Sequence, residues 1–521
     1  MRLYILDETL IILLQSNKIN IKKLLLFVLK LNHYMKNKVK LLLLLLSTCF
    51  IFQNCEDVND NPSAENTSIN SFVWNGLNTY YLWQADVPNL SDSYLDDQKK
   101  LNSLLSGYSS PEDLFQNLLY KPASMFPAGQ AVDRFSVIFS DYTLLEGVLS
   151  GNTLNNGVDF GLKRKSSTSN DVFGWVRYII ANSDASTKDI HRGDLFYAVN
   201  GTQLTLSNYQ SLIYGADNTY TLNLADYNNG NITPNGRSVS LTKTNLSENP
   251  VLMTTVINSG NHKVGYLVYN GFYANYESQL NAAFGELKSQ GVTQLVLDLR
   301  YNSGGSVDTA TRLGSMITGQ FNGEVFGKQQ WNTKVDDYYK AIDPTRFFNY
   351  FTNTLGNNEG INSLNLSKVY VLTSLSTASA SELVINALKP YINVVQIGDK
   401  TTGKNVGSIT LYDSPTFDKK DLNPNHKYAM QPLVLKIVNK EGFGDYKDGL
   451  QPTITLKEDL GNLGVLGNTS EPLLSTALNA ISTSGKKKIE DPSHIFEDVI
   501  DTQSINRFER EMYIENVPFV K

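Results

Sequence analysis

A cluster of hydroxyl side chains in front of an apolar run is the first feature that could do chemistry. The stretch TSLSTASASELVINAL, residues 373–388, holds four serines and two threonines but no histidine. A serine hydroxyl is a poor nucleophile until a neighbouring base accepts its proton. The chemistry of this stretch therefore depends on a base supplied from elsewhere in the chain.

Histidine is the usual base, and the chain has five histidines. Four of them lie in the N-terminal targeting region, in a β-rich insert, before a strand or in the C-terminal tail: His33, His191, His262 and His494. His426, in the polar stretch NPNHKY, is retained as the alternative base of a Ser-His-Asp hydrolase. No GxSxG elbow surrounds a serine in this chain, which weakens that alternative.

Lysine is the other candidate base, because Ser-Lys dyads are a convergent variant of the triad. The downstream stretch VVQIGDKTTGKNVGSITLYD places Lys400 and Lys404 in a glycine-containing turn between two predicted strands. A lysine base must be neutral, so burial or nearby positive charge has to lower its pKa. Most lysines lie on the surface, and spacing alone does not choose between the two.

Three motifs in order along the chain resemble those of the carboxyl-terminal processing peptidases, also called tail-specific proteases. They are LDLRYNSGG at 297–305, TASASE at 377–382 and GDKTTGKNVG at 398–407, against the family forms DLR.NPGG, SASASE and GE.T.GKG. The resemblance covers roughly residues 67–484. It implies a serine endopeptidase that recognises the C-terminal tail of its protein substrate and forms an acyl-enzyme, without a metal or other cofactor.

Carried over by position, the resemblance implies that Ser379 is the nucleophile and Lys404 the general base, 25 positions apart as in the family. Ser379 begins a predicted helix, whose positive dipole end favours a developing anion. The backbone N–H of Ala380 is one oxyanion-hole donor, and Gly304 or Gly305 of the NSGG turn is expected to supply the other.

The third member of the site is open. The family often has a glutamine four residues after the lysine, where this chain has Ser408. Glu382 is the other candidate, and its alternative role is that of a favourable first-turn charge on the helix.

Two further classes of function are retained as alternatives. The first is a binding protein of the cell envelope, in which a PDZ domain accompanies a catalytically impaired peptidase-like core. The second is a penicillin-recognising hydrolase with an S-x-x-K motif, a spacing found at Ser240–Lys243 and Ser484–Lys487. Neither pair is expected to share a helix face, so we treat both as chance matches.

The elements that must position these residues form three successive segments. Residues 67–150 show helical apolar spacing, with Ser110 as a predicted N-cap and Pro111 at the first helical position. Residues 156–243 read as short strands with turns, and residues 250–484 alternate strands with helices. The sequence therefore predicts a multidomain α+β protein with a helical N-terminal domain, a β-rich domain and an α/β core, which the resemblance identifies as ClpP/crotonase-like.

The β-rich segment contains IHRGDLFYAVNGTQL, in which Gly193-Asp194 and Asn200-Gly201 are predicted turns. This stretch resembles the GD.I..VNG signature of PDZ domains, which add an extended peptide as a strand and capture its C-terminal carboxylate. The resemblance implies that Phe160, Gly161 and Leu162 form the carboxylate-binding loop, and that the partner is a protein with a free C-terminus.

Composition limits the other functions. The 521 residues are 41% hydrophobic and 18% charged, with a net charge of −6, and no basic stripe indicates a nucleic-acid partner. Both cysteines, Cys49 and Cys55, lie in the first 55 residues. A disulfide, a cysteine metal site and a cysteine nucleophile in the remaining chain are therefore excluded.

The N-terminus resembles an export signal. In MKNKVKLLLLLLSTCFIFQNC, residues 35–55, three lysines precede a short apolar run, and Met35 is the expected start. Cys55 resembles a lipoprotein processing site, with Cys49 as the alternative. Residues 1–55 are thus the predicted targeting region of a Gram-negative outer-membrane lipoprotein facing the periplasm or the surface. Residues 56–66 are a linker, and the charged extension 485–521 is expected to pack loosely or to be partly disordered.

Overall fold

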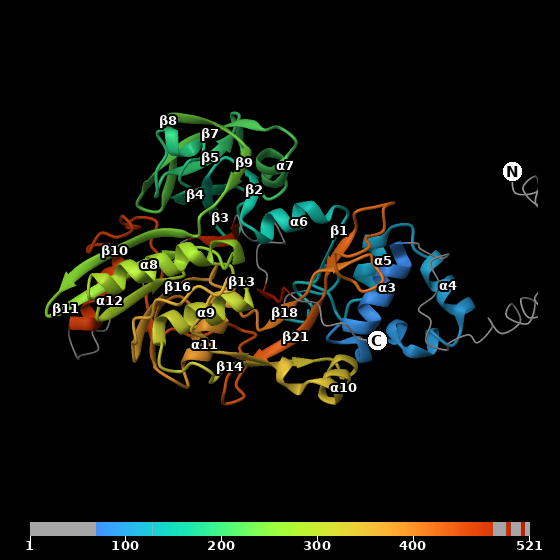
Figure 1. The fold of residues 1–521 in the computed structure, drawn as a ribbon. Helices are drawn as coiled ribbons and strands as arrows, with labels where there is room; N and C mark the ends of the chain where they lie inside the picture. Colours follow the sequence, from blue (N-terminus) through green and yellow to red (C-terminus); the bar gives the residue numbers. More distant parts are fainter. Residues whose placement is uncertain (1–68, 128, 483–495, 502–511, 516–521) are drawn as a thin grey trace, which may run out of the picture. The chain divides into compact units, whose positions relative to one another are not determined.

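The structure is a computed structural model that describes residues 69–127, 129–482, 496–501 and 512–515 (Figure 1). The predicted targeting region, with Met35 and Cys55, and the linker that follows lie outside the described residues. All of the described residues belong to one compact unit. Within the described part of the chain, no helix is both long and apolar enough to cross a membrane.

The N-terminal segment is mainly helical, as predicted. Its helices are α3 (Ile69–Tyr80), α4 (Gln98–Ser106), α5 (Pro111–Asn117) and α6 (Tyr142–Leu149). Ser110 caps α5 by accepting a 3.1 Å hydrogen bond from the Asp113 N–H, and Pro111 follows at the first helical position. The segment also contributes a strand that the sequence did not indicate. This strand is β1 (Val137–Phe139), which pairs with β20 (Ala429–Gln431), itself paired with β19 (Leu411–Tyr412).

The β-rich segment forms its own sheet around its own apolar cluster. Its strands are β3 (Val158–Arg164), β4 (Val172–Ile179), β5 (Leu195–Val199), β6 (Thr202–Gln203), β7 (Thr219–Asn228) and β8 (Asn231–Thr242), with helix α7 (Tyr209–Tyr214). Asn200 and Gly201 have φ of 52° and 78°, as the predicted hairpin turn between β5 and β6 requires. The pair β2 (Asn152–Asn155) and β9 (Thr244–Ser247) joins the two ends of this segment.

A six-stranded sheet forms the centre of the α/β core. Its order is β10 (Val251–Ser259), β11 (His262–Tyr269), β12 (Gln294–Asp298), β16 (Lys368–Thr373), β17 (Asn393–Gly398) and β22 (Ile454–Thr455). All are parallel except the edge strand β10.

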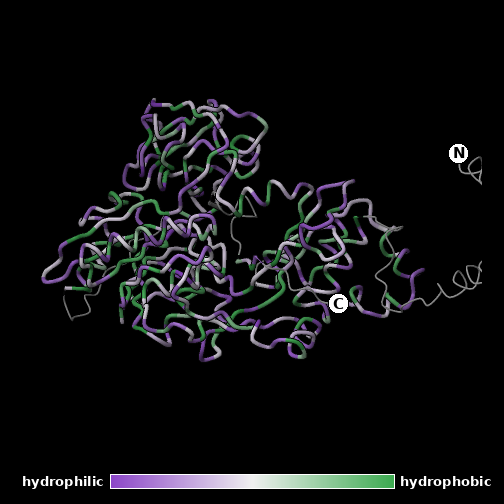
Figure 2. Tube along the Cα trace, in the orientation of Figure 1, coloured by the Kyte–Doolittle hydropathy of each residue, from purple (hydrophilic) through white to green (hydrophobic). Residues whose placement is uncertain are grey.

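The two faces of this sheet pack against different helices because side chains alternate along a strand. Leu267 and Leu297 join the apolar cluster of α8 (Glu277–Ser289), α9 (Val307–Thr318) and α11 (Ala380–Leu388). Tyr266 and Val296 join the cluster of α12 (Pro472–Ser482) on the other face. Figure 2 shows hydrophobic residues recurring along these strands. The predicted α+β fold class is confirmed.

A second six-stranded sheet carries the segments around the candidate site. Its order is β13 (Gly305–Ser306), β24 (Met512–Tyr513), β18 (Val406–Ser408), β21 (Leu433–Val438), β14 (Val325–Trp331) and β15 (Phe348–Tyr350), with α10 (Thr333–Ile342) after β14.

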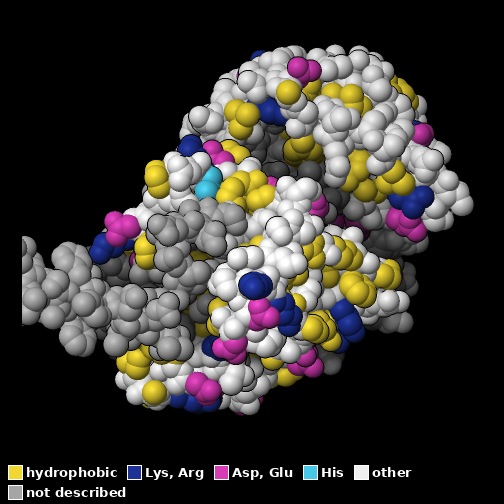
Figure 3. All heavy atoms as spheres, turned by 90° about the vertical axis from the view of Figure 1, so that its right-hand side faces the viewer, with side chains coloured by type: hydrophobic (Ala, Val, Ile, Leu, Met, Phe, Trp, Pro, Cys, Tyr) yellow, Lys and Arg dark blue, Asp and Glu magenta, His cyan; other side chains and the backbone are white. Residues whose placement is uncertain are grey.

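On the face drawn in Figure 3, the described basic and acidic side chains are interspersed and neither sign forms a continuous stripe.

The described parts of the C-terminal extension form paired strands, which the prediction of a loosely packed or partly disordered tail did not include. β23 (Glu497–Asp501) pairs with the edge strand β3, and β24 lies between β13 and β18. A strand that joins an existing edge draws its stability from backbone hydrogen bonds. It therefore needs no apolar periodicity of its own, which is why no sequence pattern predicted it.

Candidate active site

Ser379 lies at a sharp turn between β16 and α11. Its φ of 63° and ψ of −118° place a non-glycine residue in a conformation that costs on the order of 1–3 kcal/mol. Such strain is typical of nucleophile turns that present a serine at the start of a helix. The side chain is fully buried, and its Oγ has no hydrogen-bond partner among the described residues.

Hydrogen bonds join the serine turn, residues 374–381, to the glycine turn, residues 302–305, that follows β12. The Ala378 N–H and the Ser381 hydroxyl each donate to the carbonyl oxygen of Asn302, both at 3.1 Å. The Thr377 hydroxyl donates to the Leu299 carbonyl at 2.8 Å. These bonds bring the NSGG turn beside Ser379.

The predicted oxyanion-hole donors differ in whether the backbone N–H already has a hydrogen-bond acceptor. Ala380 is the first residue of α11, where a backbone N–H has no acceptor within the helix. The Gly304 N–H donates to Asn302 Oδ1 at 2.9 Å and is therefore used within its own turn. Gly305 has a φ of 135°, and a Cβ there would lie 2.4 Å from the Phe272 carbonyl oxygen, so no side chain fits. Gly305 is the better of the two glycine candidates.

Lys404 lies in the loop between β17 and β18 and is fully buried. Its Nζ lies 4.8 Å from the centre of the Phe135 ring, which comes from the N-terminal segment. The neighbouring Arg134 donates to the carbonyls of Gly403 and Lys447, which holds this segment against the lysine loop. Burial meets one requirement for a lysine base, because desolvation favours the neutral amine.

Glu382 joins the serine and lysine segments. Its Oε2 accepts the backbone N–H groups of Ser379 and Lys404, both at 2.8 Å, and its Oε1 accepts the Gly403 N–H at 2.7 Å and the Thr401 hydroxyl. Burial raises the pKa of Glu382, while these four donors act in the opposite direction. One buried carboxyl thus fixes the backbone on both sides of the candidate dyad.

The other candidate residues make their own contacts. The Ser408 hydroxyl donates to the Met512 carbonyl of the tail at 3.3 Å. His426 Nε2 lies 2.8 Å from Asp413 Oδ2 in its polar loop. Ser240 lies in β8, and the Lys243 Nζ donates to the Gly215 carbonyl at 3.3 Å. Ser484 and Lys487 lie outside the described residues.

The predicted carboxylate-binding loop is not a loop. Phe160, Gly161 and Leu162 are buried in the middle of β3, because the chain is already extended there and pairs with β4. The turn lies just before them, at Gly157, whose φ is 95°. Its donors are used locally, since the Gly157 N–H donates to Asn155 Oδ1 at 2.7 Å and the next N–H to Asn156 Oδ1 at 3.1 Å.

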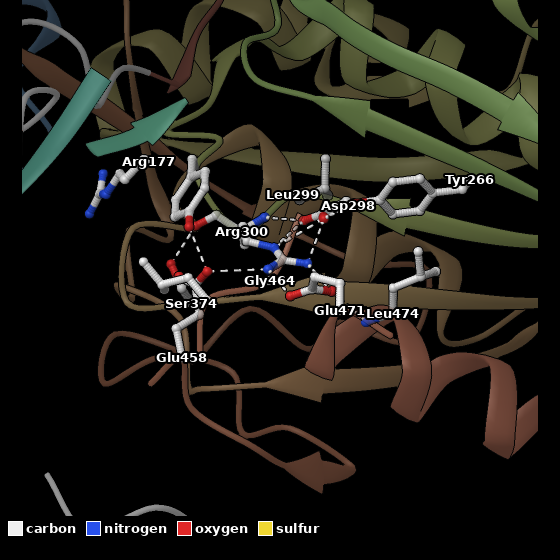
Figure 4. A network of polar contacts seen from close by, with 12 residues as sticks. Arg177, Tyr266, Asp298, Leu299, Arg300, Ser374, Glu458, Gly464, Glu471 and Leu474 are labelled. Atoms are coloured by element: carbon white, nitrogen blue, oxygen red, sulfur yellow. Dashed lines mark hydrogen bonds and ion pairs between the residues drawn. The ribbon is translucent and has the colours of Figure 1, made fainter. Parts of the chain in front are cut away.

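A buried ionic network, drawn in Figure 4, surrounds Arg300, which lies in the chain between β12 and the glycine turn. Arg300 bonds Asp298 at 2.8 Å, Glu471 at 2.7 Å and Glu458 at 3.2 Å. Its own carbonyl accepts the Ser374 hydroxyl at the start of the serine turn. Asp298 and Arg300 belong to the motif LDLRYNSGG, whereas the two glutamates come from a region with no recognisable motif.

The β-rich domain also contributes to this network. Arg192 Nη2 lies 2.8 Å from Glu458 Oε1, and Arg177 Nη2 donates to Ser376 Oγ at 2.8 Å. Burial would raise the pKa of Glu458, but Arg192 and Arg300 hold it at about 2. The network therefore ties the β-rich domain to the turn that carries Ser379.

Comparisons with known proteins agree with this architecture. Residues 263–414 match the model of peptidase family S41, and residues 68–137 match the peptidase S41 N-terminal domain. A crystal structure from Bacteroides fragilis NCTC 9343 assigned to the S41 proteases is similar with a TM-score of 0.61 and 28% identity. The match covers 80% of this chain and 98% of that one.

Two curated relatives are similar in sequence. The chloroplastic C-terminal processing peptidase of Tetradesmus obliquus is 27% identical over 301 residues, which is 54% of this chain and 58% of that protein. The carboxyl-terminal-processing protease of Picosynechococcus is 28% identical over 168 residues, 32% of this chain and 35% of that protein. The chain thus spans between about a third and just over half of the length of these relatives. From these matches, residues 68–137 and 263–414 of the chain are similar to peptidase family S41, and the chain is distantly similar to the C-terminal processing peptidases.

Proposed function

We propose that this protein is a serine endopeptidase in which Ser379 is the nucleophile and Lys404 the general base. The observation that carries the proposal is the shared support of the two residues by Glu382, whose Oε2 holds both backbone N–H groups at 2.8 Å. The strained φ of Ser379 and the full burial of Lys404 support the same assignment.

The proposed reaction is acyl transfer. The Ser379 Oγ forms a bond to the scissile carbonyl carbon while its proton passes to Lys404 Nζ. The N–H groups of Ala380 and Gly305 stabilise the oxyanion, and the leaving amine takes the proton as the C–N bond breaks. Water then attacks the ester with Lys404 as base, which releases the acyl product and restores the serine.

Substitution of the two residues tests the assignment. We expect Ser379→Ala and Lys404→Met to reduce the cleavage of an unstructured protein by at least about 10³-fold, because either change removes the activated nucleophile. Lys400→Ala is the matched control, since Lys400 lies in the same loop but is exposed, and it should retain activity. Cleavage that survives Ser379→Ala would refute the nucleophile assignment.

Recognition of the substrate's C-terminal tail is a finer part of the proposal, supported by the PDZ-like signature and by strand addition at β3. The same unstructured protein is compared with a free and with an amidated C-terminus. Faster cleavage of the free form would support carboxylate capture. Equal rates would indicate that the β3 edge accepts internal segments, as the occupied donors of the Gly157 turn suggest.

We also propose that the protein is exported and anchored in the cell envelope through a lipid on Cys55, on the basis of residues 35–55. Expression of the full chain with Cys55→Ser or Cys49→Ser, followed by metabolic labelling with a fatty acid, tests this. Loss of label only with Cys55→Ser is the expected result.

A further inference from the structure

The C-terminal extension of this chain occupies the edge of the β-rich domain on which a peptide would add as a strand. β23 pairs antiparallel with β3, with Asp501 opposite Gly161 and Ile500 opposite Leu162. Val499 packs against the apolar cluster of the domain, and the Phe496 ring lies 4.9 Å from that of Phe173. β3 therefore has a strand on both sides.

Two ion pairs add to this contact. Lys163 Nζ lies 2.5 Å from Asp498 Oδ1, and Arg164 Nη1 lies 3.3 Å from Glu497 Oε2. Both acids are exposed, so each pair contributes little to stability. Their charges match the two basic residues of β3, which favours this register of the acidic segment over others.

A second part of the extension lies in the sheet beside the candidate site. β24 pairs in parallel with β13 on one side and with β18 on the other. β13 contains Gly305, and β18 begins two residues after Lys404. Because neighbouring strands lie about 4.8 Å apart, the space between β13 and β18 has the width of one extended chain, and Met512–Tyr513 fills it.

The contacts in this slot are specific. The Ile514 N–H donates to the Ser408 carbonyl at 3.1 Å, and the Ser408 hydroxyl donates to the Met512 carbonyl at 3.3 Å. The Ser306 hydroxyl donates to Glu515 Oε1 at 2.6 Å, and the Tyr513 hydroxyl to the Leu149 carbonyl at 3.3 Å. Met512 is fully buried.

We propose that residues 497–501 and 512–515 act as an inhibitory ligand within the chain, occupying the β3 edge and the slot between β13 and β18 in place of an extended substrate. The proposal rests on the proposed peptidase function. In this proposal an extended substrate runs past Gly305 to reach Ser379 and pairs with β13 and β18. The tail already pairs with both of these strands.

Because the tail is part of the same chain, even a weak intrinsic affinity is enough to keep it docked. A tethered segment acts at an effective concentration on the order of millimolar. A tail with only micromolar intrinsic affinity would therefore be docked most of the time. A substrate would then bind with an affinity reduced by the undocked fraction.

A binding experiment tests the occupancy without relying on activity. Full-length protein carrying Ser379→Ala is combined with Ile514→Pro, which removes the N–H that Ser408 accepts, or with Ile514→Val as the matched control. The probe is a fluorescent peptide with the sequence of residues 496–515. We expect the proline variant to bind the probe at least about ten-fold more tightly than the valine control. Equal binding by the two variants would overturn the proposal.

An activity experiment follows with Ser379 intact. Ile514→Pro should raise kcat/KM for an unstructured protein by about ten-fold, and Ile514→Val should not. If no variant cleaves but the probe still distinguishes them, the proposed peptidase function fails while the occupancy stands. If all variants cleave equally and bind the probe equally, the peptidase function stands and the inhibitory role is overturned.

A second variant tests the proposal independently, in case Ile514→Pro does not fold. Val499→Asp places a charge against the apolar cluster of the β-rich domain and should release β23, with the same gain in probe binding. If circular dichroism shows that both variants lose the fold, the extension is a structural strand and the proposal is overturned.

Discussion

At the scale of single residues, the site depends on Glu382 as much as on the proposed dyad. Four donors converge on its carboxyl, from both the serine and the lysine segments. An amide has only one acceptor oxygen, so Glu382→Gln must leave buried donors without partners, at about 1–3 kcal/mol each.

We expect Glu382→Gln to lower kcat about 10²-fold with little change in KM, because a displacement of about 1 Å between reacting groups has an effect of that size. The measurement is steady-state cleavage kinetics together with a thermal melt. Glu146→Gln, which alters a carboxylate bonded to Tyr412, is the control and should leave kcat unchanged. An equal fall in kcat for both variants would contradict the positioning role.

Glu248 should make the folding stability depend on pH. Burial and the neighbouring Asp159 raise its pKa to about 7, although Tyr178 and Asn270 donate to it. In the unfolded chain its pKa is about 4.3, so the folded state binds the extra proton. The stability from this group is therefore complete below about pH 4.3 and is lost as the pH rises through 7.

The melting temperature of the parent should thus fall between pH 5 and pH 8 by an amount equivalent to about 1 kcal/mol or more. Glu248→Gln should remove that part of the pH dependence. Parallel pH profiles for the two proteins would refute the assignment of the shift to Glu248.

At the scale of elements, the turn after β12 is held by the buried network around Arg300. Arg300 is 1% exposed and Glu471 is 1% exposed, so removal of the arginine would leave carboxylates buried without a counter-charge. Breaking one partner of such a network costs about 3–5 kcal/mol, whereas neutralising all partners costs far less.

Arg300→Met should therefore lower the free energy of unfolding by about 3–5 kcal/mol in urea denaturation. Combining it with Asp298→Asn and Glu471→Gln should recover most of the loss. A single variant that loses less than about 1 kcal/mol would show that the carboxylates find other partners.

The elements also show where sequence reasoning succeeds. The stretches TQLVLDLR and KVYVLTS, residues 293–300 and 368–374, each read as a strand leading into a turn and a helix. The structure has β12 and β16 within them. The backbone of Ser379 could not be foreseen, because nothing in a serine-rich stretch indicates which residue has a positive φ. The convergence of Glu382 on Lys404 depends on the folded loop and has no sequence signature. The roles of Ser379 and Lys404 stay predictions.

At the scale of the whole molecule, the family and the fold class followed from three ordered motifs, but the position of the C-terminal extension did not. β24 is only two residues long, and a pairing across about 200 positions leaves no local pattern. Its register is set by backbone groups of β13 and β18, which become neighbours only after folding.

The tail should also respond to pH through Glu515. Partial burial and Asp308 of α9 raise the pKa of Glu515 to about 7, against the hydrogen bond from Ser306 and the charge of Arg312. Released into solvent, the carboxyl would titrate near 4.3, so docking takes up a proton. Docking is therefore strongest below about pH 4.3 and weakens as the pH rises through 7.

The ratio of the kcat/KM of Ile514→Pro to that of the parent should accordingly shrink a few-fold between pH 5.5 and pH 8. The change is modest because the Glu515 side chain is exposed. Glu515→Gln keeps the acceptor for Ser306 without the repulsion from Asp308. Its tail should stay docked at pH 8. The ratio of kcat/KM between Glu515→Gln with and without Ile514→Pro should therefore not change with pH. A ratio that shrinks equally in both backgrounds would show that the pH dependence arises elsewhere, because only the parent carries a titrating group at this contact.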